Sequence, residues 1–396
     1  MNSQNKNKIG IIGAGAAGLA AAVTVGSVLR SSKELNCWQI DLIEKKNEPG
    51  KKLLATGNGK CNITNKNADD YGLCEKFFSD LGILFAEENA GRIYPYSKQA
   101  LTVRDTLLAA VADCKVNIFT DVTIEKITNN DDGFLLIDQN NVQHRYDKLI
   151  LTTGGKAGIQ HGSDGSGLKM ARELGIPIQP ILPALVPMTY GKNPGLELTR
   201  LKGVRSFVNL RLKHRGRVIA EEQGELQFTD YGLSGICIFN LSRYLKKIPR
   251  DGNKIQDCTV EIDLAPDYSY DEILYLLSQN LKAGLKGIVN DKIVGMLVAA
   301  GMDPVKDAAK TAAAIKALFV NISGTKGWKE AQVTSGGIGL DHVHMATMEA
   351  NHVKGLYLAG EILDYDGPCG GYNLSWAWKT GIAAGHGVID GIEADD

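Results

Sequence analysis

The feature that most constrains the fold of this chain is a glycine-rich segment close to its N-terminus. Lys8 to Ile12 is a short apolar run of the kind that forms a strand buried in a parallel sheet. Residues 13–18 read Gly-Ala-Gly-Ala-Ala-Gly, which matches GxGxxG, and a good helix former, Leu19 to Val23, follows. A second strand, Gln39 to Ile43, ends at Glu44. This order of strand, glycine loop, helix, strand and acid is typical of a dinucleotide-binding fold.

The three glycines have separate roles in such a fold. Gly13 permits a tight turn, Gly15 lets the backbone approach a pyrophosphate, and Gly18 lets the helix pack closely on the strand. The phosphates would lie on free N–H groups at the start of the helix, around Ala16 and Ala17, where the helix dipole favours negative charge. The alternative interpretation is a buried helix that is simply rich in glycine and alanine.

The acid that ends the second strand helps to select the cofactor. Glu44, followed by Lys45, would accept hydrogen bonds from the hydroxyl groups of an adenosine ribose. A carboxylate at this position disfavours a 2′-phosphate, so FAD or NAD fits better than NADP. In this fold a residue near Val122 commonly meets adenine through its backbone.

Composition excludes several classes of protein. The chain has 396 residues and a net charge of −1, so it is long enough for two or three domains and lacks the basic excess of a nucleic-acid-binding protein. Its 7 cysteines form no CxxC pair, which indicates a reducing compartment. No apolar stretch of about 20 residues appears, which argues against a membrane span. We therefore expect a cytoplasmic protein that binds neither nucleic acid nor membrane.

Residues 50–65 read Gly-Lys-Lys-Leu-Leu-Ala-Thr-Gly-Asn-Gly-Lys-Cys-Asn-Ile-Thr-Asn. This run closely resembles the GKK…SGxGRCNxTN signature of the HI0933-like flavoprotein family, also called YhiN- or BaiN-like, which includes enzymes described as aminoacetone oxidases. The resemblance continues in the expected order over essentially the whole chain, at residues 152–155, 162–167, 183–187, 336–338, 347–349, 355–364 and 370–373.

The resemblance implies FAD, and the residue pattern suggests how the chain would hold it. Gly360 and Glu361 follow a strand, and such an acid binds the ribityl or phosphate region of the flavin. Residues 370–373 open a final helix, from Leu374 to about Ile389, whose N–H groups could face the N1/C2=O edge of the ring. The other residues expected at the cofactor are Lys52, Gly57, Gly59, Lys60, Cys61, Asn62, Thr153, Gly154, Gly155, Gly370, Gly371, Tyr372 and Asn373. For Lys52, a solvated basic turn is as good an interpretation as contact with phosphate.

The substrate side departs from the family pattern. Lys156-Ala157-Gly158 stands where many relatives have Ser-Tyr-Pro, and Asp230 and Ile236 stand where relatives carry His and Pro. These departures leave the catalytic residues unassigned and prevent transfer of a relative's substrate.

Other chemical groups have ordinary alternatives. Cys61 could take part in redox chemistry, but packing is the simpler role. His161 could face substrate or lie in an exposed loop, and Arg92 lies in a family-like segment without an assignable role. His342 and His344 have a spacing that could bind metal, but no third ligand follows, so we expect no metal site.

The fold class that we expect is α/β, with a Rossmann-like FAD-binding domain of the two-dinucleotide-binding-fold type and an inserted β-rich domain that carries a helical subdomain. Residues 1–187 and 339–396 would form the discontinuous FAD-binding domain, 188–265 and 324–338 the β-rich domain, and 266–323 the helical insert. Residues 116–127 and 133–138 would be strands of a small antiparallel excursion.

These features predict an FAD-dependent oxidoreductase, a dehydrogenase or an oxidase, that moves a hydride between a small organic substrate and flavin N5. NAD(P)H or oxygen would be the second redox partner, although no second GxGxxG follows a strand. The alternative is a protein whose flavin is structural or regulatory and acts through a partner.

Overall fold

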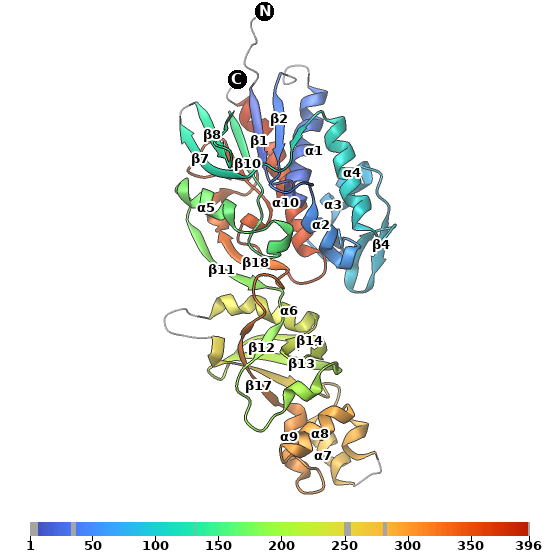
Figure 1. The fold of residues 1–396 in the computed structure, drawn as a ribbon. Coiled ribbons are helices and arrows are strands. Elements are labelled where there is room, and N and C mark those ends of the chain that lie inside the picture. Colours follow the sequence, from blue (N-terminus) through green and yellow to red (C-terminus); the bar gives the residue numbers. More distant parts are fainter. Residues whose placement is uncertain (1–6, 33–36, 131, 249–254, 280–282, 395–396) are drawn as a thin grey trace, which may run out of the picture. The chain divides into compact units, whose positions relative to one another are not determined.

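The computed structural model describes residues 7–32, 37–130, 132–248, 255–279 and 283–394 (Figure 1). The chain forms two compact units, Met1–Leu182 with Val333–Asp396, and Pro183–Gln332. No described helix combines the length and the apolar composition that crossing a bilayer requires.

The centre of the first unit is a seven-stranded sheet, in which five neighbouring strands run parallel and two short strands extend one edge in antiparallel pairing. In spatial order the strands are β19 (Val343–His344), β20 (Glu349–Ala350), β21 (Leu356–Leu358), β10 (Lys148–Leu151), β1 (Lys8–Ile12), β2 (Gln39–Ile43) and β6 (Asn117–Phe119). All residues of β10 and β21 are buried, as expected for strands covered on both faces.

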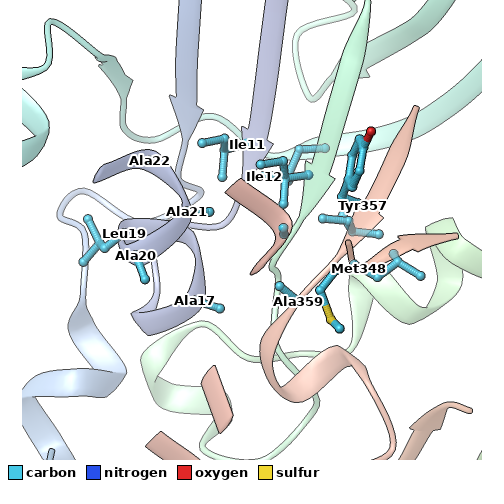
Figure 2. Packing of buried hydrophobic residues seen from close by; sticks show 14 of the residues in the cluster. Ile11, Ile12, Ala17, Leu19, Ala20, Ala21, Ala22, Met348, Tyr357 and Ala359 are labelled. Atoms are coloured by element: carbon cyan, nitrogen blue, oxygen red, sulfur yellow. The ribbon is translucent and has the colours of Figure 1, made fainter. Parts of the chain in front are cut away.

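Helices α1 (Ala16–Ser31) and α10 (Tyr372–Glu393) pack against each other and against this sheet. Small residues make the close approach possible, because a Cβ at Gly381 of α10 would overlap the carbonyl oxygen of Ala17 in α1. Figure 2 shows Ala17 and Ala21 of α1 in one apolar cluster with Ile11 and Ile12 of β1. The first turn of α1 is thereby held against the middle of α10.

The rest of the first unit surrounds this core. Its helices are α2 (Lys51–Ala55), α3 (Tyr71–Asp80), α4 (Ala100–Asp113) and α5 (Ser166–Glu173), with short 3₁₀ turns η1 (Thr56–Gly59), η3 (Ile159–His161) and η9 (Gly360–Ile362). Its smaller sheets are β3 (Thr64–Asn65) with β5 (Arg92–Pro95) and β4 (Phe85–Glu88), β7 (Ile124–Asn130) with β8 (Gly133–Asp138) and β9 (Gln143–Tyr146), and β11 (Ile178–Ala184) with β18 (Val333–Ile338).

Residues 116–127 differ from the expected excursion. They split at a turn where Asp121 has a φ of 58°, so that β6 joins the main sheet beside β2 and only β7 enters the antiparallel sheet. The turn is fixed because Asp121 N–H donates to the carbonyl of Lys46 at 3.1 Å.

The second unit is built on a closed antiparallel barrel whose strands alternate buried and exposed residues, as in β13, where Val208, Leu210 and Leu212 are buried. In barrel order the strands are β12 (Met188–Tyr190), β15 (Gly232–Ser234), β14 (Arg217–Phe228), β13 (Arg205–His214), β16 (Cys258–Asp263) and β17 (Leu318–Thr325). Its helices are α6 (Ile236–Arg243), α7 (Tyr270–Ser278), α8 (Asp291–Ala299) and α9 (Ala308–Lys316).

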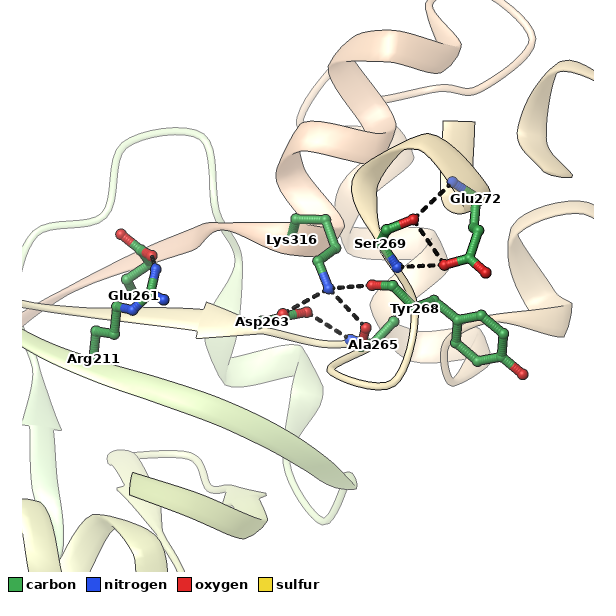
Figure 3. Close-up of polar contacts among 8 residues, drawn as sticks. All are labelled: Arg211, Glu261, Asp263, Ala265, Tyr268, Ser269, Glu272 and Lys316. Atoms are coloured by element: carbon green, nitrogen blue, oxygen red, sulfur yellow. Dashed lines mark hydrogen bonds and ion pairs between the residues drawn. The ribbon is translucent and has the colours of Figure 1, made fainter. Parts of the chain in front are cut away.

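One lysine joins the helical segment to the barrel (Figure 3). Lys316, the last residue of α9, pairs with Asp263 at 2.7 Å and donates to the carbonyls of Ala265 at 2.9 Å and Tyr268 at 2.5 Å. Ser269 and Glu272 form a capping box that starts α7 directly after this linker. The linker from β16 into α7 is therefore fixed at both of its ends.

The boundaries of these parts differ from those expected from the sequence. Residues 318–323, expected in the helical insert, belong to β17, whose alternating burial fits a barrel strand. β18, expected in the β-rich domain, belongs to the first unit, where Gly336 packs against the carbonyl of Pro180. The first unit gives way to the second after Leu182 rather than after Pro187.

Candidate cofactor site

The glycine loop between β1 and α1 shows why each glycine is needed. Gly13 has a φ of +102°, and a Cβ there would lie 2.7 Å from the carbonyl oxygen of Thr152. A Cβ at Gly18 would overlap the carbonyl oxygen of Gly13. A Cβ at Gly15 would meet no protein atom within 4 Å. Gly13 and Gly18 are thus required by the fold, whereas Gly15 borders open space.

The start of α1 is suited to an anion. Gly15 is its N-cap, no side chain caps the first N–H groups, and no acidic residue lies in the first turn, which contains Ala16 and Ala17. Uncapped N–H groups at the positive end of a helix dipole are a common phosphate site.

Glu44 lies at this loop. Its Oε2 accepts the N–H of Ala14 and its Oε1 accepts the N–H of Lys46, both at 2.9 Å. The N–H of Val122 donates to the carbonyl of Glu44 at 3.0 Å, so only the carbonyl of Val122 is left for contact with adenine. Lys45 is paired with Asp164 at 2.8 Å.

A second polar cluster joins segments that are far apart in sequence. Lys52 Nζ lies 2.6 Å from Glu361 Oε2, and the other oxygen of Glu361 accepts the N–H of Thr334 at 2.6 Å. The Thr334 hydroxyl in turn accepts the N–H groups of Lys156 and Ala157 at 2.7 and 3.0 Å. This hydroxyl also occupies the space where Gly155 would carry a Cβ. Residues 155–157, in the segment that follows β10, are therefore connected to Glu361 through Thr334, a residue that the sequence analysis did not single out.

His161 lies close to this cluster. A Cβ on Gly158 would be 3.5 Å from His161 Cδ2 and 3.6 Å from Lys52 Cε. Partial burial, together with the positive charges of Lys52 and Lys51, lowers the pKa of His161 below 6.5. These surroundings therefore favour the neutral form of the imidazole.

The loop after α2 brings Asn62 against the start of α10. Gly371, the N-cap of α10, has a φ of +102°, and a Cβ there would lie 3.0 Å from Asn62 Oδ1 and overlap the carbonyl oxygen of Thr64. Asn62 Oδ1 is buried and has no hydrogen-bond partner in the part of the chain that the structure describes. A buried acceptor without a donor is rare, so this atom is placed to accept a hydrogen bond from a bound ligand or an ordered water.

Cys61, which directly precedes Asn62 in this loop, is fully buried and has a φ of 57°. Burial raises the pKa of its thiol to about 12. A thiol with this pKa is not a nucleophile at neutral pH, which supports packing rather than redox chemistry. In the same loop, a Cβ at Gly57 would lie 3.2 Å from Tyr94 Cε1, whereas one at Gly59 would meet nothing within 4 Å.

The start of α10 is held by contacts that sequence spacing could not reveal. The Asn373 side chain bonds both the N–H and the carbonyl of Gly367, at 2.8 and 2.9 Å, so it is committed to the preceding loop. Gly360 donates to Thr380 Oγ1 at 2.9 Å and accepts from Trp376 Nε1 at 3.2 Å. At Gly371 and Tyr372 the backbone N–H groups, which no side chain caps, are available to a ligand.

Two further groups considered in the sequence analysis, Lys60 and His342, lie beside other partners in the structure. Lys60 Nζ lies 5.9 Å from the ring centroid of Tyr94 and 4.0 Å from Glu88, so its ammonium group already has local partners. His342 lies 3.9 Å from Asp341, and no group of three His, Cys, Asp or Glu side chains that could hold a metal occurs in the described part of the chain.

Three observations test whether these residues fit FAD. Open space borders Gly15 at an uncapped helix start, as a pyrophosphate requires. A second uncapped helix start, that of α10, is available for the electron-rich N1/C2=O edge of a flavin. Asn62 Oδ1 lacks a donor beside it, and a flavin carries an N3–H that could supply one. The residues present therefore fit the cofactor.

Comparison with known proteins identifies the family of this chain. The sequence model of the HI0933-like protein Rossmann domain matches residues 73–387. The chain is 34% identical to the 3-dehydro-bile acid delta(4,6)-reductase of Clostridium scindens, over 97% of this chain and 99% of that protein. It is 29% identical to the ribosomal RNA dihydrouridine synthase of Escherichia coli, over 96% of this chain and 97% of that protein.

Among solved structures, the chain is similar to a flavocytochrome c3 fumarate reductase in its open conformation, with 13% identity, a TM-score of 0.48, and coverage of 98% of this chain and 79% of that one. The family match covers most of the chain and agrees with the resemblance seen in the sequence motifs. The chain belongs to the HI0933-like family, and it is an FAD-dependent oxidoreductase of that family.

Proposed function

We propose that this protein reduces a carbon–carbon double bond that is conjugated with a carbonyl group in a small organic molecule. The observation that carries the proposal is a bond type common to two relatives, which align with 97% and 96% of this chain. A 3-dehydro bile acid with delta(4,6) unsaturation is a conjugated ketone, and the uracil double bond that becomes dihydrouracil is also conjugated with a carbonyl. The shared chemistry is therefore addition of a hydride and a proton across an activated double bond.

The residues around the cofactor site are suited to reduction of the substrate by the flavin. When bound, FAD would supply the hydride from N5. The uncapped N–H groups at Gly371 and Tyr372 would stabilise the negative charge that collects at N1 and C2=O on reduction. Glu44 would hold the ribose, and the first turn of α1 the pyrophosphate.

A reductase needs an electron donor, and we propose NAD(P)H for this role. Oxygen would act as a competing acceptor of the same electrons. A nicotinamide that reduces the flavin directly and then leaves needs no Rossmann motif of its own, so the lack of a second GxGxxG after a strand is compatible with this role.

The substrate is proposed to be a small molecule rather than RNA. The net charge of −1 does not favour a polyanion, because nucleic-acid binding depends on lysine and arginine contacts to phosphate. The ribosomal RNA of the second relative remains the alternative substrate of the same bond class.

The test uses the FAD-loaded protein under anaerobic conditions. The flavin is first bleached with NADH or NADPH, and then a steroid 4-en-3-one, a simple cyclic enone or a uridine-containing RNA is added. We expect rapid return of the flavin absorbance with an enone and no return with the matched saturated ketone or isolated alkene. Equal reoxidation by the saturated ketone, or none by any conjugated compound, would contradict the proposal.

A further inference from the structure

A positively charged side chain without an acidic partner lies beside the candidate flavin site. Arg92 is the first residue of β5 and is half-buried. Among the described residues, no carboxylate lies within 4.0 Å of its guanidinium group. A half-buried guanidinium normally meets a carboxylate or another anion. Its hydrogen bond to the Tyr94 side chain is with a neutral partner, so Arg92 retains the capacity to bind a negatively charged or strongly polarised oxygen.

The acid opposite Arg92 in the neighbouring strand, Glu88, is already paired with other residues. Glu88 forms an ion pair with Lys98 at 2.7 Å and lies 4.0 Å from Lys60. Its pKa is lowered chiefly by the hydrogen bond from Lys98, and Arg92 makes only a small contribution. The charge of Arg92 is therefore not balanced within its own sheet.

The position of Arg92 relative to α10 is fixed by Asn65. The backbone of Arg92 pairs with that of Asn65 in β3. The buried Asn65 side chain donates to the carbonyl of Gly370 at 2.8 Å and to the carbonyl of Ala90 at 3.0 Å. A Cβ on Gly370 would lie 3.8 Å from Arg92 Nε, so the arginine side chain runs along the turn that begins α10.

A second observation indicates that a ligand belongs at this turn. Asn62 Oδ1, which is buried and has no hydrogen-bond partner among the described residues, lies against Gly371 in the same turn. A guanidinium that lacks an anion therefore borders Gly370, and an acceptor that lacks a donor borders the adjacent Gly371. A flavin edge and a substrate carbonyl would satisfy them together.

We propose that Arg92 binds the carbonyl oxygen of the substrate and polarises the conjugated double bond; this inference rests on the function proposed above. Hydride addition to the β carbon breaks the carbon–carbon π bond and moves its electron pair through the α carbon to the carbonyl oxygen. The guanidinium stabilises the resulting enolate oxygen with charge-assisted hydrogen bonds. A proton from water then forms the α C–H bond as the carbonyl is restored, so that one hydride and one proton are added in total.

The experiment uses 4-chlorophenol, a probe that cannot be reduced. As a phenolate it resembles the enolate, and stacked on an oxidised flavin it produces a long-wavelength charge-transfer band. We expect this band with the wild-type FAD-loaded protein. In Arg92→Gln we expect the Kd of the phenolate to rise at least ~10-fold, as expected for loss of charge-assisted hydrogen bonds. Arg92→Lys keeps the positive charge but loses the planar guanidinium group with its paired N–H donors, so its Kd for the phenolate should be intermediate.

Lys66→Gln is the matched control, because it removes one positive charge from an exposed pair with Glu87 next to β3. It should bind the phenolate as the wild type does. FAD content and circular dichroism establish that each variant is folded and loaded. Reduction of the flavin by NAD(P)H should be unchanged in Arg92→Gln, whereas its reoxidation by an enone should slow at least ~10-fold.

Several results would overturn the inference. One is the absence of the charge-transfer band in the wild type, and another is an unchanged phenolate Kd in both Arg92 variants. A third is a lower flavin reduction potential in the Arg92 variants with unchanged phenolate binding, which would place Arg92 on the flavin itself. The proposed function fails separately. If the phenolate binds in an Arg92-dependent manner but no enone is reduced, the oxyanion site stands and the substrate class is wrong.

Discussion

The ammonium group of Lys52 lies 2.6 Å from the carboxylate of Glu361, although 309 positions separate the two residues in the chain. Their side chains are 27% and 20% exposed, so the pair is partly shielded from water. Glu361 also accepts the N–H of Thr334 at the start of β18. The pair therefore ties the N-terminal part of the first unit to its C-terminal part, at two positions expected to contact the cofactor.

Substitution of Lys52 tests whether this pair supports the cofactor. In Lys52→Met, Glu361 loses its cation and leaves an uncompensated negative charge near the expected flavin phosphates. Loss of one partner of a shielded pair costs about 1–3 kcal/mol, so we expect the Kd for FAD to rise roughly 10-fold. Fluorescence titration of the apoprotein with FAD measures this. Lys51→Met is the matched control, because the ammonium group of Lys51 bonds the exposed Asn47 rather than Glu361. Equal weakening by both variants would mean that the pair itself has no special role.

Two glycines of the same loop should respond differently to alanine. A Cβ at Gly15 meets no protein atom and Gly15 has an ordinary φ of −81°, so Gly15→Ala should fold with a loss of about 1 kcal/mol or less. The methyl group would enter the space expected to hold the pyrophosphate, and FAD affinity should fall at least ~10-fold. Gly18→Ala should instead destabilise the apoprotein, because its Cβ would overlap the carbonyl of Gly13. Retention of full FAD affinity by Gly15→Ala would refute our placement of the pyrophosphate.

The contact between α1 and α10 predicts a third effect. Gly381→Ala forces a methyl group onto the carbonyl of Ala17, and overpacking of this kind costs about 1–3 kcal/mol. Gly295, in the middle of α8, offers the opposite case, because its Cβ would meet nothing within 4 Å. Gly295→Ala should stabilise by about 0.5–1 kcal/mol through helix propensity. Urea unfolding of both variants measures whether the free energy of unfolding falls in Gly381→Ala and rises in Gly295→Ala. An unchanged midpoint for Gly381→Ala would show that α1 and α10 can move apart without cost.

Local patterns in the sequence were sufficient for β1, the glycine loop and Glu44, because their geometry is set within one βαβ unit. They were insufficient for Thr334, Trp376, Thr380 and Asn65, whose partners lie far away along the chain. Residues 318–323 were expected in a helical segment because the apolar spacing before them is helical, but β17 is defined by pairing with β16 and β12. The partners that define such a strand lie far away along the chain.

Lys316 provides a prediction for the second unit. Lys316→Met removes an ion pair with Asp263 and leaves two backbone carbonyls of the linker without this donor. We expect a loss of about 1–3 kcal/mol in the unfolding of this unit. Lys310→Met changes an exposed lysine of the same helix and should be within about 0.5 kcal/mol of the wild type. Proteolysis in the segment 264–269, followed by mass spectrometry, should be faster in Lys316→Met only; equal rates would show that the linker is held by other contacts.

The buried thiol of Cys61 predicts how stability depends on alkaline pH. Burial raises the pKa of this thiol from 9.0 to about 12, so the folded protein keeps a proton that the unfolded chain releases above pH 9. Because the folded state binds more protons in this range, the free energy of unfolding must fall as the pH rises from about 9 toward 12. Cys61→Ala removes the titrating group and should flatten this fall relative to the wild type, when both are measured by urea unfolding at pH 8 and pH 10. The two slopes would coincide if Cys61 ionised as readily in the folded protein as in the unfolded chain, and rapid alkylation of Cys61 by iodoacetamide in the folded protein at pH 8 would contradict the prediction directly.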